Sequence, residues 1–211
     1  MSGHPVVLSV NVGRPRTVEY RGSRHTTAIW KSPVSGRLAL CGVNLAGDDQ
    51  ADRSVHGGVD KAVYAYSRAD YDWWESELGR PLEPGTFGEN LTVAGIDPSA
   101  AVIGERWRVG SVLLEVSEPR FPCFKLGIRM DDPRFLKRFA AAGRPGTYLR
   151  ISEEGELGAG DEIEVVERPA HGVTIGQFAH AFLRERDRLV EILAADQLSE
   201  RWRGWILESS S

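Results

Sequence analysis

The chain has 211 residues, a length that favours one core domain and leaves room for a small appendage. Its 26 Lys and Arg against 30 Asp and Glu give a net charge of −4, which argues against a nucleic-acid footprint over the whole surface. No stretch approaches the roughly 18 apolar residues of a membrane span. The start shows no signal pattern, and two distant cysteines exclude a disulfide scaffold, so we expect a cytoplasmic protein.

The first two thirds of the sequence consist mainly of short β-like runs separated by Gly-rich turns. The runs that we expect to be strands are 6–12, 24–30, 37–41, 62–66, 91–93, 106–109, 112–116, 147–151 and 162–166. Two helices interrupt them, one over 67–78 and one that opens at Asp132-Pro133. Because regular βαβ units are missing, the pattern favours a mainly β fold with some α, arranged as a barrel or a folded sheet.

The composition changes after residue 169, and no strand pattern follows. Thr174 and Gln177 form a capping-box pattern, 189–193 carries an apolar stripe, and 199–207 carries Trp202 and Trp205. We therefore predict a β-barrel-like domain over residues 1–169 and a three-helix appendage over 170–211. The tryptophans are compatible with packing on the barrel of the same chain and with a homodimer.

The densest chemical signal surrounds Cys123. Between residues 120 and 138 there are six basic residues against two acidic ones, in a chain that is acidic overall. A cysteine that follows Pro122, opens a helical turn and has cations nearby is favoured as a thiolate, which suits a nucleophile or a soft-metal ligand. The alternative is a cysteine buried among aromatic neighbours. Cys41, in an apolar run without nearby charge, is expected in the core.

Three weaker signals lie upstream. In the segment 52–61, His56 and Lys61 flank a Gly-Gly pair that can form an anion-binding nest or simply a sharp turn. A zinc site with Asp48, Asp52 and His56 lacks a second His or Cys. Asn90 precedes a strand, where it either binds a heterocycle edge or finishes a turn. Lys31-Ser32 at a strand end offers a possible anion contact, while dinucleotide-fold, P-loop and nucleophile-elbow motifs are absent.

Taken in order, these segments resemble the YiiM type of MOSC domain. The segments that carry the resemblance are 30–34, 47–52, 56–64, 85–92, 119–123 and 143–150, followed by the helical tail. The resemblance covers nearly the whole chain. It implies a β-barrel-like fold related to the C-terminal domain of molybdenum-cofactor sulfurase.

The resemblance also implies the molybdenum cofactor, Mo-molybdopterin, as a ligand. Cys123 matches the family cysteine that would supply the protein thiolate to molybdenum, and His56 is expected to be catalytic with it. The residues that we expect to contact the cofactor are Lys31, Ser32, Lys61, Asn90 and Arg120. Lys31 and Ser32 match phosphate-contacting positions of related amidoxime reductases. Arg120, His56 and Lys61 are expected to contact the pterin or the phosphate of the cofactor, or to protonate the substrate.

The implied activity is that of an oxidoreductase that reduces N-hydroxylated bases or amidoximes to the amine or amidine. The cofactor would take the oxygen of the N–O bond as two electrons pass to the small-molecule substrate. Two isolated cysteines cannot ligate an iron–sulfur cluster, so a separate reductase is expected to supply electrons. Neither a membrane nor a nucleic-acid polymer is expected as a partner. The alternatives are a sulfur carrier with a persulfide on Cys123, and a protein that stores or inserts the cofactor without turnover.

Overall fold

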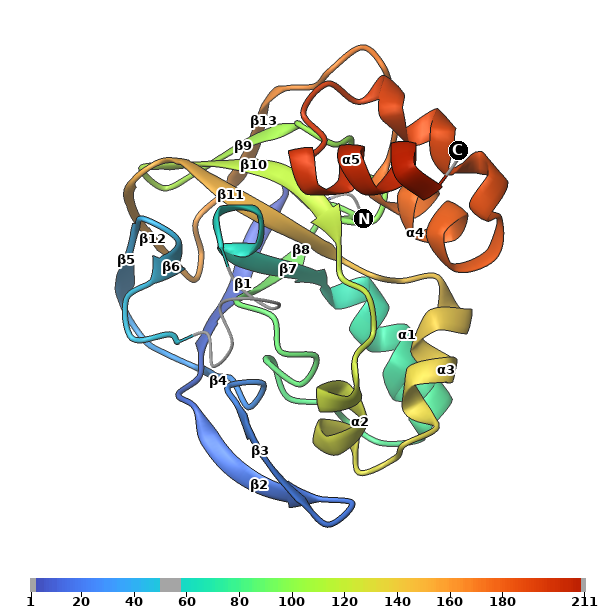
Figure 1. Cartoon of the computed structure of the whole chain (residues 1–211). Helices are drawn as coiled ribbons and strands as arrows, with labels where there is room; N and C mark the ends of the chain where they lie inside the picture. Colours follow the sequence, from blue (N-terminus) through green and yellow to red (C-terminus); the bar gives the residue numbers. More distant parts are fainter. Residues whose placement is uncertain (1–2, 50–57, 210–211) are drawn as a thin grey trace.

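The computed structural model describes residues 3–49 and 58–209, and an eight-stranded sheet forms its centre (Figure 1). The strands of this sheet are β1 (Val6–Val12), β4 (Ser32–Pro33), β7 (Val63–Ser67), β8 (Leu91–Ala94), β9 (Arg106–Val109), β10 (Val112–Pro119), β11 (Thr147–Glu153) and β13 (Ile163–Glu167). Their order is β13-β9-β10-β11-β7-β8-β1-β4. The β7–β8 pair is parallel and the other pairs are antiparallel, as expected for a fold built mainly from hairpins and meanders.

The sheet curls back on itself without closing into a barrel. The start of β1 meets the start of β13 through one isolated bridge, Val6 to Glu162. The backbone N–H of Val7 donates to the carbonyl of Asp161 at 2.9 Å, and that of Ile163 donates to the carbonyl of Pro5 at 2.8 Å. No continuous ladder joins the two strands, so the barrel is open between β1 and β13. The prediction of a mainly β, barrel-like fold with helices is confirmed in this open form.

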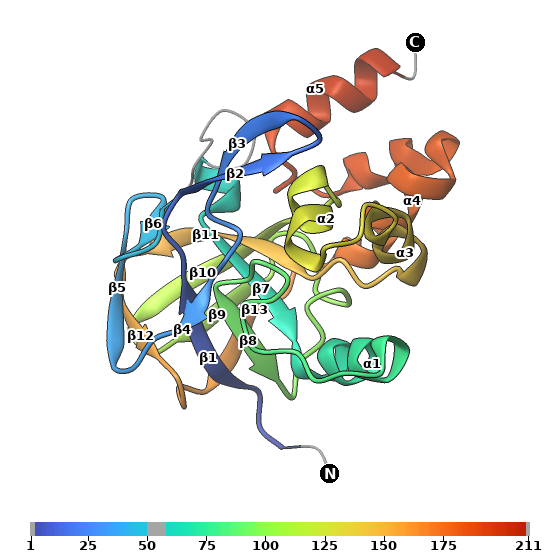
Figure 2. The ribbon, with the colours of Figure 1, turned by 90° about the horizontal axis from the view of Figure 1, so that it is seen from below.

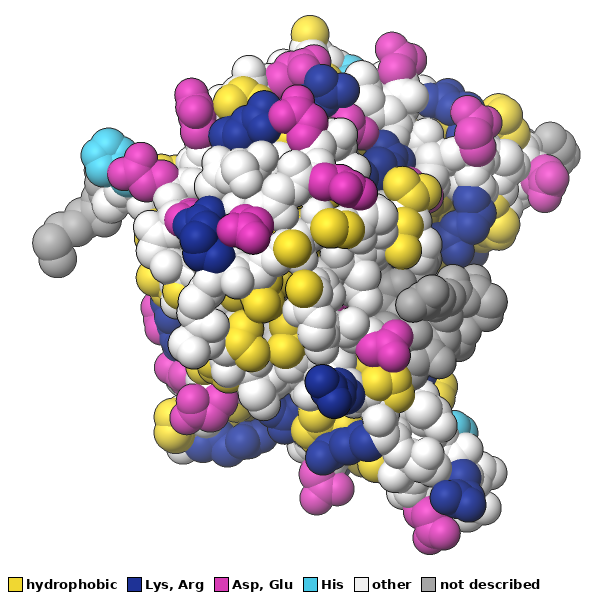
Figure 3. All heavy atoms as spheres, turned by 90° about the vertical axis from the view of Figure 1, so that its left-hand side faces the viewer, with side chains coloured by type: hydrophobic (Ala, Val, Ile, Leu, Met, Phe, Trp, Pro, Cys, Tyr) yellow, Lys and Arg dark blue, Asp and Glu magenta, His cyan; other side chains and the backbone are white. Residues whose placement is uncertain are grey.

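Two smaller sheets flank the central one. One contains β5 (Arg37–Cys41), β6 (Asn44–Leu45) and β12 (Gly155–Gly158), and the other is the hairpin of β2 (Arg16–Tyr20) and β3 (Ser23–Thr27). The hairpin extends from the lower end of the body, and on the face shown in Figure 3 basic and acidic side chains are interspersed.

The small sheets correct three sequence predictions. The segment over β12 was expected to be a turn, but it pairs with β5, a partner more than a hundred residues away. The strand predicted over 24–30 ends at Thr27, and β2 was not predicted. Cys41 is exposed, so its placement in the core was wrong: side chains alternate along a strand, and the neighbouring Leu40 takes the buried side.

Helices α1 (Arg68–Leu78), α2 (Phe124–Met130) and α3 (Phe135–Ala142) lie together beside the sheet (Figure 2). The predicted cap of α1 is confirmed, because the Ser67 hydroxyl accepts from the Asp70 N–H at 3.0 Å. An aromatic cluster joins α1 and α3, with the rings of Trp74 and Phe139 stacked at 6.1 Å. Leu126 and Met130 of α2 belong to the same cluster, so it fixes the position of α2, which carries part of the candidate site.

The C-terminal segment comprises α4 (Ile175–Arg184), the 3₁₀ segment η2 (Arg186–Ala194) and α5 (Glu200–Ser209). The capping box is confirmed: the Gln177 N–H donates to the Thr174 hydroxyl at 3.1 Å, and the Thr174 N–H donates to the Gln177 side chain at 2.8 Å. Trp202 packs against Phe178 of the tail, at 5.0 Å between ring centres, and against Phe121 of the body, at 5.5 Å. The tryptophan therefore packs within its own chain.

Side chains of α4, η2 and α5 belong to the same hydrophobic cluster as the sheet, so the C-terminal segment shares its core with the rest of the chain. Two expectations stay predictions: the division into domains at residues 1–169 and 170–211, and the homodimer. Within 3–49 and 58–209, no helix has the length and apolar character needed to cross a bilayer.

Candidate functional site

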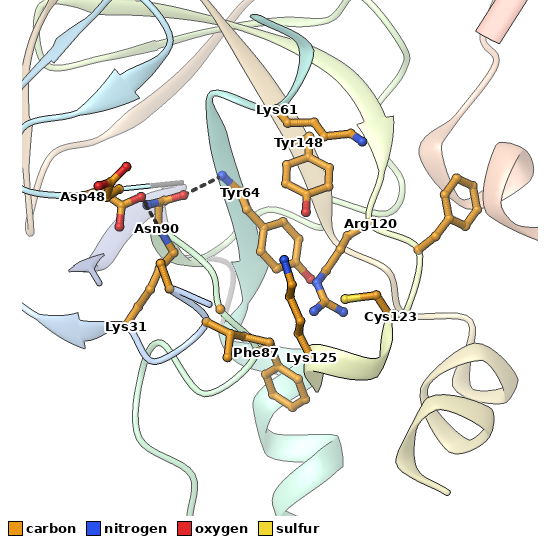
Figure 4. Close-up of a pocket in the computed structure, with 15 residues that line it drawn as sticks. Lys31, Asp48, Lys61, Tyr64, Phe87, Asn90, Arg120, Cys123, Lys125 and Tyr148 are labelled. Atoms are coloured by element: carbon orange, nitrogen blue, oxygen red, sulfur yellow. Dashed lines mark hydrogen bonds and ion pairs between the residues drawn. The ribbon is translucent and has the colours of Figure 1, made fainter. Parts of the chain in front are cut away.

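A pocket of about 670 Å³, a volume that includes its open mouth, lies between the end of β10, α2 and the first part of the chain. Figure 4 shows its polar side chains converging from elements that are far apart in sequence. The lining residues are Ala28, Ile29, Lys31, Asp48, Asp49, Lys61, Tyr64, Phe87, Gly88, Asn90, Arg120, Phe121, Cys123, Lys125 and Tyr148. Pockets lined by apolar and aromatic side chains with a few converging polar groups are typical of sites for small molecules.

Cys123 stands at the beginning of α2, with an extended backbone (φ −127°, ψ 165°) that directs the chain from β10 into the helix. Its side chain is partly exposed and lines the pocket, so the alternative of a cysteine buried in the core is wrong. Figure 4 shows the sulfur directed toward the Arg120 guanidinium. A soft donor atom and a fixed cation therefore share one wall of the pocket.

Arg120 is 5% exposed, and its Nη1 is buried without a hydrogen-bond partner. Its guanidinium lies 5.6 Å from the ring centre of Tyr64 and 5.4 Å from that of Phe139. Burial acts most strongly and lowers the pKa of Arg120, but the interactions with Tyr64, Cys123, Tyr148 and Tyr66 together outweigh it and raise the pKa. Arg120 is thus a buried cation with one unused donor, and an anion in the pocket would satisfy it.

Two lysines add positive charge to the pocket. Lys125 is 9% exposed and has no carboxylate partner within the described ranges. Lys61, which follows the turn at Gly58, pairs with Glu118 at 3.3 Å and lies 6.0 Å from the ring centre of Tyr148. Burial raises the pKa of Glu118, and the positive charges of Lys61 and Arg201 oppose this. The positive charge of Lys61 is therefore largely compensated, whereas no carboxylate of the described residues pairs with Lys125.

Lys31 and Asn90 are held by a shared partner, Asp48. Asp48 forms a buried ion pair with Lys31, while its other oxygen accepts from the backbone N–H of Gly13 at 2.7 Å. The amide of Asn90 donates to Asp48 at 2.9 Å, and its oxygen accepts from the backbone N–H of Tyr64 at 3.1 Å. Burial lowers the pKa of Lys31, with Asp48 acting in the opposite direction. This trio joins three distant segments, and a ligand of Lys31 would compete with Asp48.

Glu89, next to Asn90, has a structural role below the pocket. It is fully buried and accepts hydrogen bonds from the Tyr71 hydroxyl at 2.5 Å, the Gly85 N–H at 2.7 Å and the Thr92 hydroxyl at 2.8 Å. Burial raises the pKa of its carboxyl group, and these donors partly offset that effect. The Gly-rich segment before β8 is therefore organised around a carboxylate that sequence reasoning did not single out.

The pocket brings together five of the seven predicted site residues: Lys31, Lys61, Asn90, Arg120 and Cys123. Ser32 is exposed, pairs with Val12 of β1 and does not line the pocket. His56 and Asp52 lie outside the described residues. Within the described ranges no group of three or more His, Cys, Asp or Glu side chains is arranged for a metal ion.

The lining residues that the prediction missed include Asp48 as the partner of Lys31, Tyr64, Lys125 and Tyr148. Lys125 was counted only as part of a basic run. Its proximity to Cys123 in sequence was a usable signal, because residues of one helical turn share a neighbourhood. For Asp48, Tyr64 and Tyr148, whose positions depend on strand pairing, the sequence offered no such signal.

Comparison with known proteins places this chain in a family. The model of the MOSC domain matches residues 52–164, over half of the chain. The chain belongs to the MOSC domain family. As a MOSC protein, it is 38% identical to the uncharacterized protein YflK of Bacillus subtilis, with 93% of this chain and 90% of that protein covered. It is 33% identical to Protein YiiM of Escherichia coli, with 83% and 81% covered.

Solved structures agree with this MOSC assignment. The crystal structure of YiiM from Geobacillus stearothermophilus matches with a TM-score of 0.81 and 29% identity, over 98% of this chain and 100% of that one. YiiM from Escherichia coli matches with a TM-score of 0.76 and 25% identity, over 99% and 93%. A protein of Gibberella moniliformis named Reductase is 39% identical over 78% of this chain but only 30% of its own length.

Proposed function

We propose that the pocket binds the molybdenum cofactor, with Cys123 as the protein thiolate to molybdenum, and that the protein reduces N-hydroxylated compounds. The observation that carries the proposal is the buried, unpartnered Nη1 of Arg120 on the same wall as the partly exposed Cys123. Burying an unused charged donor costs free energy, and a bound anion recovers it. A dithiolene cofactor with a phosphate group is such an anion and carries a soft metal.

The residues present fit this group in charge and in donor type. Thiolate sulfur is a preferred ligand of soft metals, and Cys123 is the cysteine that lines the pocket. Arg120 and Lys125 provide positive charge next to it, and Lys61 provides a further ammonium group near Tyr148. When bound, the cofactor would supply the two-electron chemistry of oxygen transfer.

The residues of the chain would bind and orient the reactants. Arg120, stacked near Tyr64 and Phe139, offers a donor in a fixed position, which makes it suited to holding an anion without reorganisation. Phe87 and Tyr148 cover part of the lining and reduce the access of water. We assign Lys61 and His56 the role of hydrogen bonding to oxygen atoms of the cofactor or the substrate. Lys31 would bind the cofactor phosphate, which would replace Asp48 as its ionic partner.

Electrons would come from a separate reductase. The chain matches less than a third of the fungal protein named Reductase, so a segment similar to this chain occurs within a longer protein of that name. Within the described ranges, the partly exposed Cys123 and the exposed Cys41 are the free cysteines, which are too few to ligate an iron–sulfur cluster.

The test replaces each cysteine separately. We expect Cys123→Ser to lose most of the bound molybdenum, because serine is a harder ligand than thiolate. Cys41→Ser, a matched change at an exposed cysteine outside the pocket, should retain it. Molybdenum per mole of protein is measured by elemental mass spectrometry after expression in a host that makes the cofactor.

The outcomes separate the proposal from its alternatives. Full retention of molybdenum by Cys123→Ser would overturn the role of the thiolate. An adduct of about 32 Da on Cys123, one sulfur atom, in wild-type protein that lacks molybdenum would identify a sulfur carrier. Wild-type protein that holds molybdenum but reduces no N-hydroxylated base or amidoxime with a chemical reductant would be a storage or insertion protein.

A further inference from the structure

The C-terminal segment supports one wall of the pocket from outside. Phe121, which lines the pocket, has its ring centre 4.3 Å from that of Phe182 in α4 and 5.5 Å from that of Trp202 in α5. Trp202 is 9% exposed and does not line the pocket itself. The segment therefore contacts the site through side chains that lie behind its lining.

A first chain of polar contacts runs from this segment to Lys61. The indole N–H of Trp202 donates to Oε2 of Glu118 at 2.8 Å, and Oε1 of Glu118 lies 3.3 Å from the ammonium nitrogen of Lys61. Glu118 belongs to β10 and its side chain is 3% exposed, while that of the pocket residue Lys61 is 13% exposed. Figure 4 shows the Lys61 ammonium group directed toward β10. One oxygen of Glu118 thus contacts the C-terminal segment, and the other contacts the pocket lysine.

The Trp202 N–H fixes the direction of the Glu118 carboxylate. A buried carboxylate needs donors for both oxygens, and the loss of one donor is costly. Burial already raises the pKa of Glu118, against the charges of Lys61 and Arg201. Arg201 is 58% exposed and reaches Oε1 at 3.5 Å. Without the indole donor, the carboxylate would turn toward this exposed guanidinium and toward water, and its contact with Lys61 would weaken.

A second chain of contacts reaches the residue next to this lysine. The carbonyl of Gln197, which lies between η2 and α5, accepts from Nη1 of Arg150 at 3.0 Å, and Nε of Arg150 donates to Asp60 at 2.6 Å. The Ser117 hydroxyl donates to the carbonyl of Asp60 at 2.5 Å. Asp60 belongs to the 3₁₀ turn η1 (Val59–Lys61), and so short a turn has little stability of its own. Its position therefore depends on these contacts.

We propose that Glu118 and Trp202 are positioning residues, through which the C-terminal segment holds the ammonium group of Lys61 at the pocket. Trp202 acts on Glu118 and Glu118 acts on Lys61, while neither Trp202 nor Glu118 lines the pocket. A cation that is already fixed binds an anion without the loss of side-chain freedom that a mobile lysine would suffer. The inference goes beyond the proposed function, because the position of Lys61 can be measured in protein that holds no cofactor.

The experiment measures how fast an amine-selective acetylating reagent modifies Lys61, by peptide mass spectrometry of full-length protein from a host that cannot make the cofactor. Lys31 is the internal standard, because its side chain is similarly buried, at 9% exposed, and its ion pair belongs to neither chain of contacts. Trp202→Phe keeps a ring and removes the N–H donor, so we expect the rate at Lys61 to rise about tenfold, the effect of one charge-assisted hydrogen bond. The matched control is Trp205→Phe, the same change in α5 at a ring that packs on Phe182.

A second variant separates positioning from a general structural role. Glu118→Gln keeps the size of the side chain and an acceptor for Trp202, but it removes the ionic contact with Lys61. It should raise the rate at Lys61 at least as much as Trp202→Phe does. If Trp202 acts through Glu118, the double variant is modified at Lys61 as fast as Glu118→Gln alone, whereas two independent structural losses would multiply.

The rates decide the proposal. A rate at Lys61 that stays within about twofold of wild type in Trp202→Phe overturns it. An equal rise in Trp205→Phe, or an equal rise at Lys31, also overturns it, because either result indicates a general loosening of the protein. If Trp202→Phe does not fold, as judged by thermal unfolding, Glu118→Gln replaces it, and an unchanged rate at Lys61 in that variant again contradicts the proposal.

One consequence rests on the proposed function. If Lys61 holds the cofactor, Trp202→Phe lowers the molybdenum content relative to Trp205→Phe, and it has no further effect when combined with Lys61→Met. Equal molybdenum contents in the two tryptophan variants would overturn this consequence. A failure of the proposed function appears in Cys123→Ser, and a failure of the positioning role appears in the acetylation rates, so the two are distinguishable.

Discussion

Replacing Asp48 by Asn tests whether the ion pair with Lys31 holds the floor of the pocket. The side chains of Lys31 and Asp48 are 9% and 2% exposed, so the pair is buried. Removing one charge of a buried pair leaves the other uncompensated, which typically costs about 3 to 5 kcal/mol. The Asp48→Asn side chain would also offer one acceptor oxygen where the carboxylate receives Lys31, Asn90 and the Gly13 N–H. We therefore expect the free energy of unfolding to fall by that amount.

Urea unfolding followed by tryptophan fluorescence measures this loss. Asp72→Asn is the matched control, because Asp72 is 66% exposed in its pair with Arg68 and should cost less than about 1 kcal/mol. The double variant Lys31→Met with Asp48→Asn should regain much of the stability, since it removes the lone buried cation. A cost below about 1 kcal/mol for Asp48→Asn, or a double variant no more stable than the single one, would refute the reasoning.

Two further predictions concern the walls of the pocket. Gly85→Ala should destabilise the protein by at least about 1 kcal/mol more than Gly36→Ala. Both glycines have a left-handed φ, +86° and +85°, but a Cβ on Gly85 would lie 2.5 Å from the Lys31 carbonyl oxygen whereas Gly36 faces open space, and equal losses in urea unfolding would contradict this. Burial raises the pKa of Tyr148 from 10.0 to about 12, so the unfolded chain releases this proton first and stability falls as pH rises through that range. Tyr148→Phe should lose less stability over the same range, and an unchanged pH profile would argue against a raised pKa at Tyr148.

Local sequence signals predicted much of the fold. The strands β1, β5, β9 and β10 and the caps at Ser67 and Thr174 follow from alternation, turn residues and capping patterns, which operate within a few residues. The failures are at positions where a distant partner decides. The Gly-rich segment of β12 is a strand because β5 pairs with it, and Cys41 is exposed because Leu40 takes the side of β5 that packs into the core.

The candidate site likewise combines features that depend on neighbours along the chain with features that depend on distant segments. Cys123, Arg120 and Lys125 lie within six residues of one another, so their chemistry was readable from the sequence, as was the resemblance to MOSC domains. Only the tertiary structure determines that Nη1 of Arg120 is buried without a hydrogen-bond partner and that Lys31 forms an ion pair with Asp48. Neighbours along the chain fix which groups are available, but burial and pairing depend on segments that meet only after folding, and these determine which charges remain for a ligand.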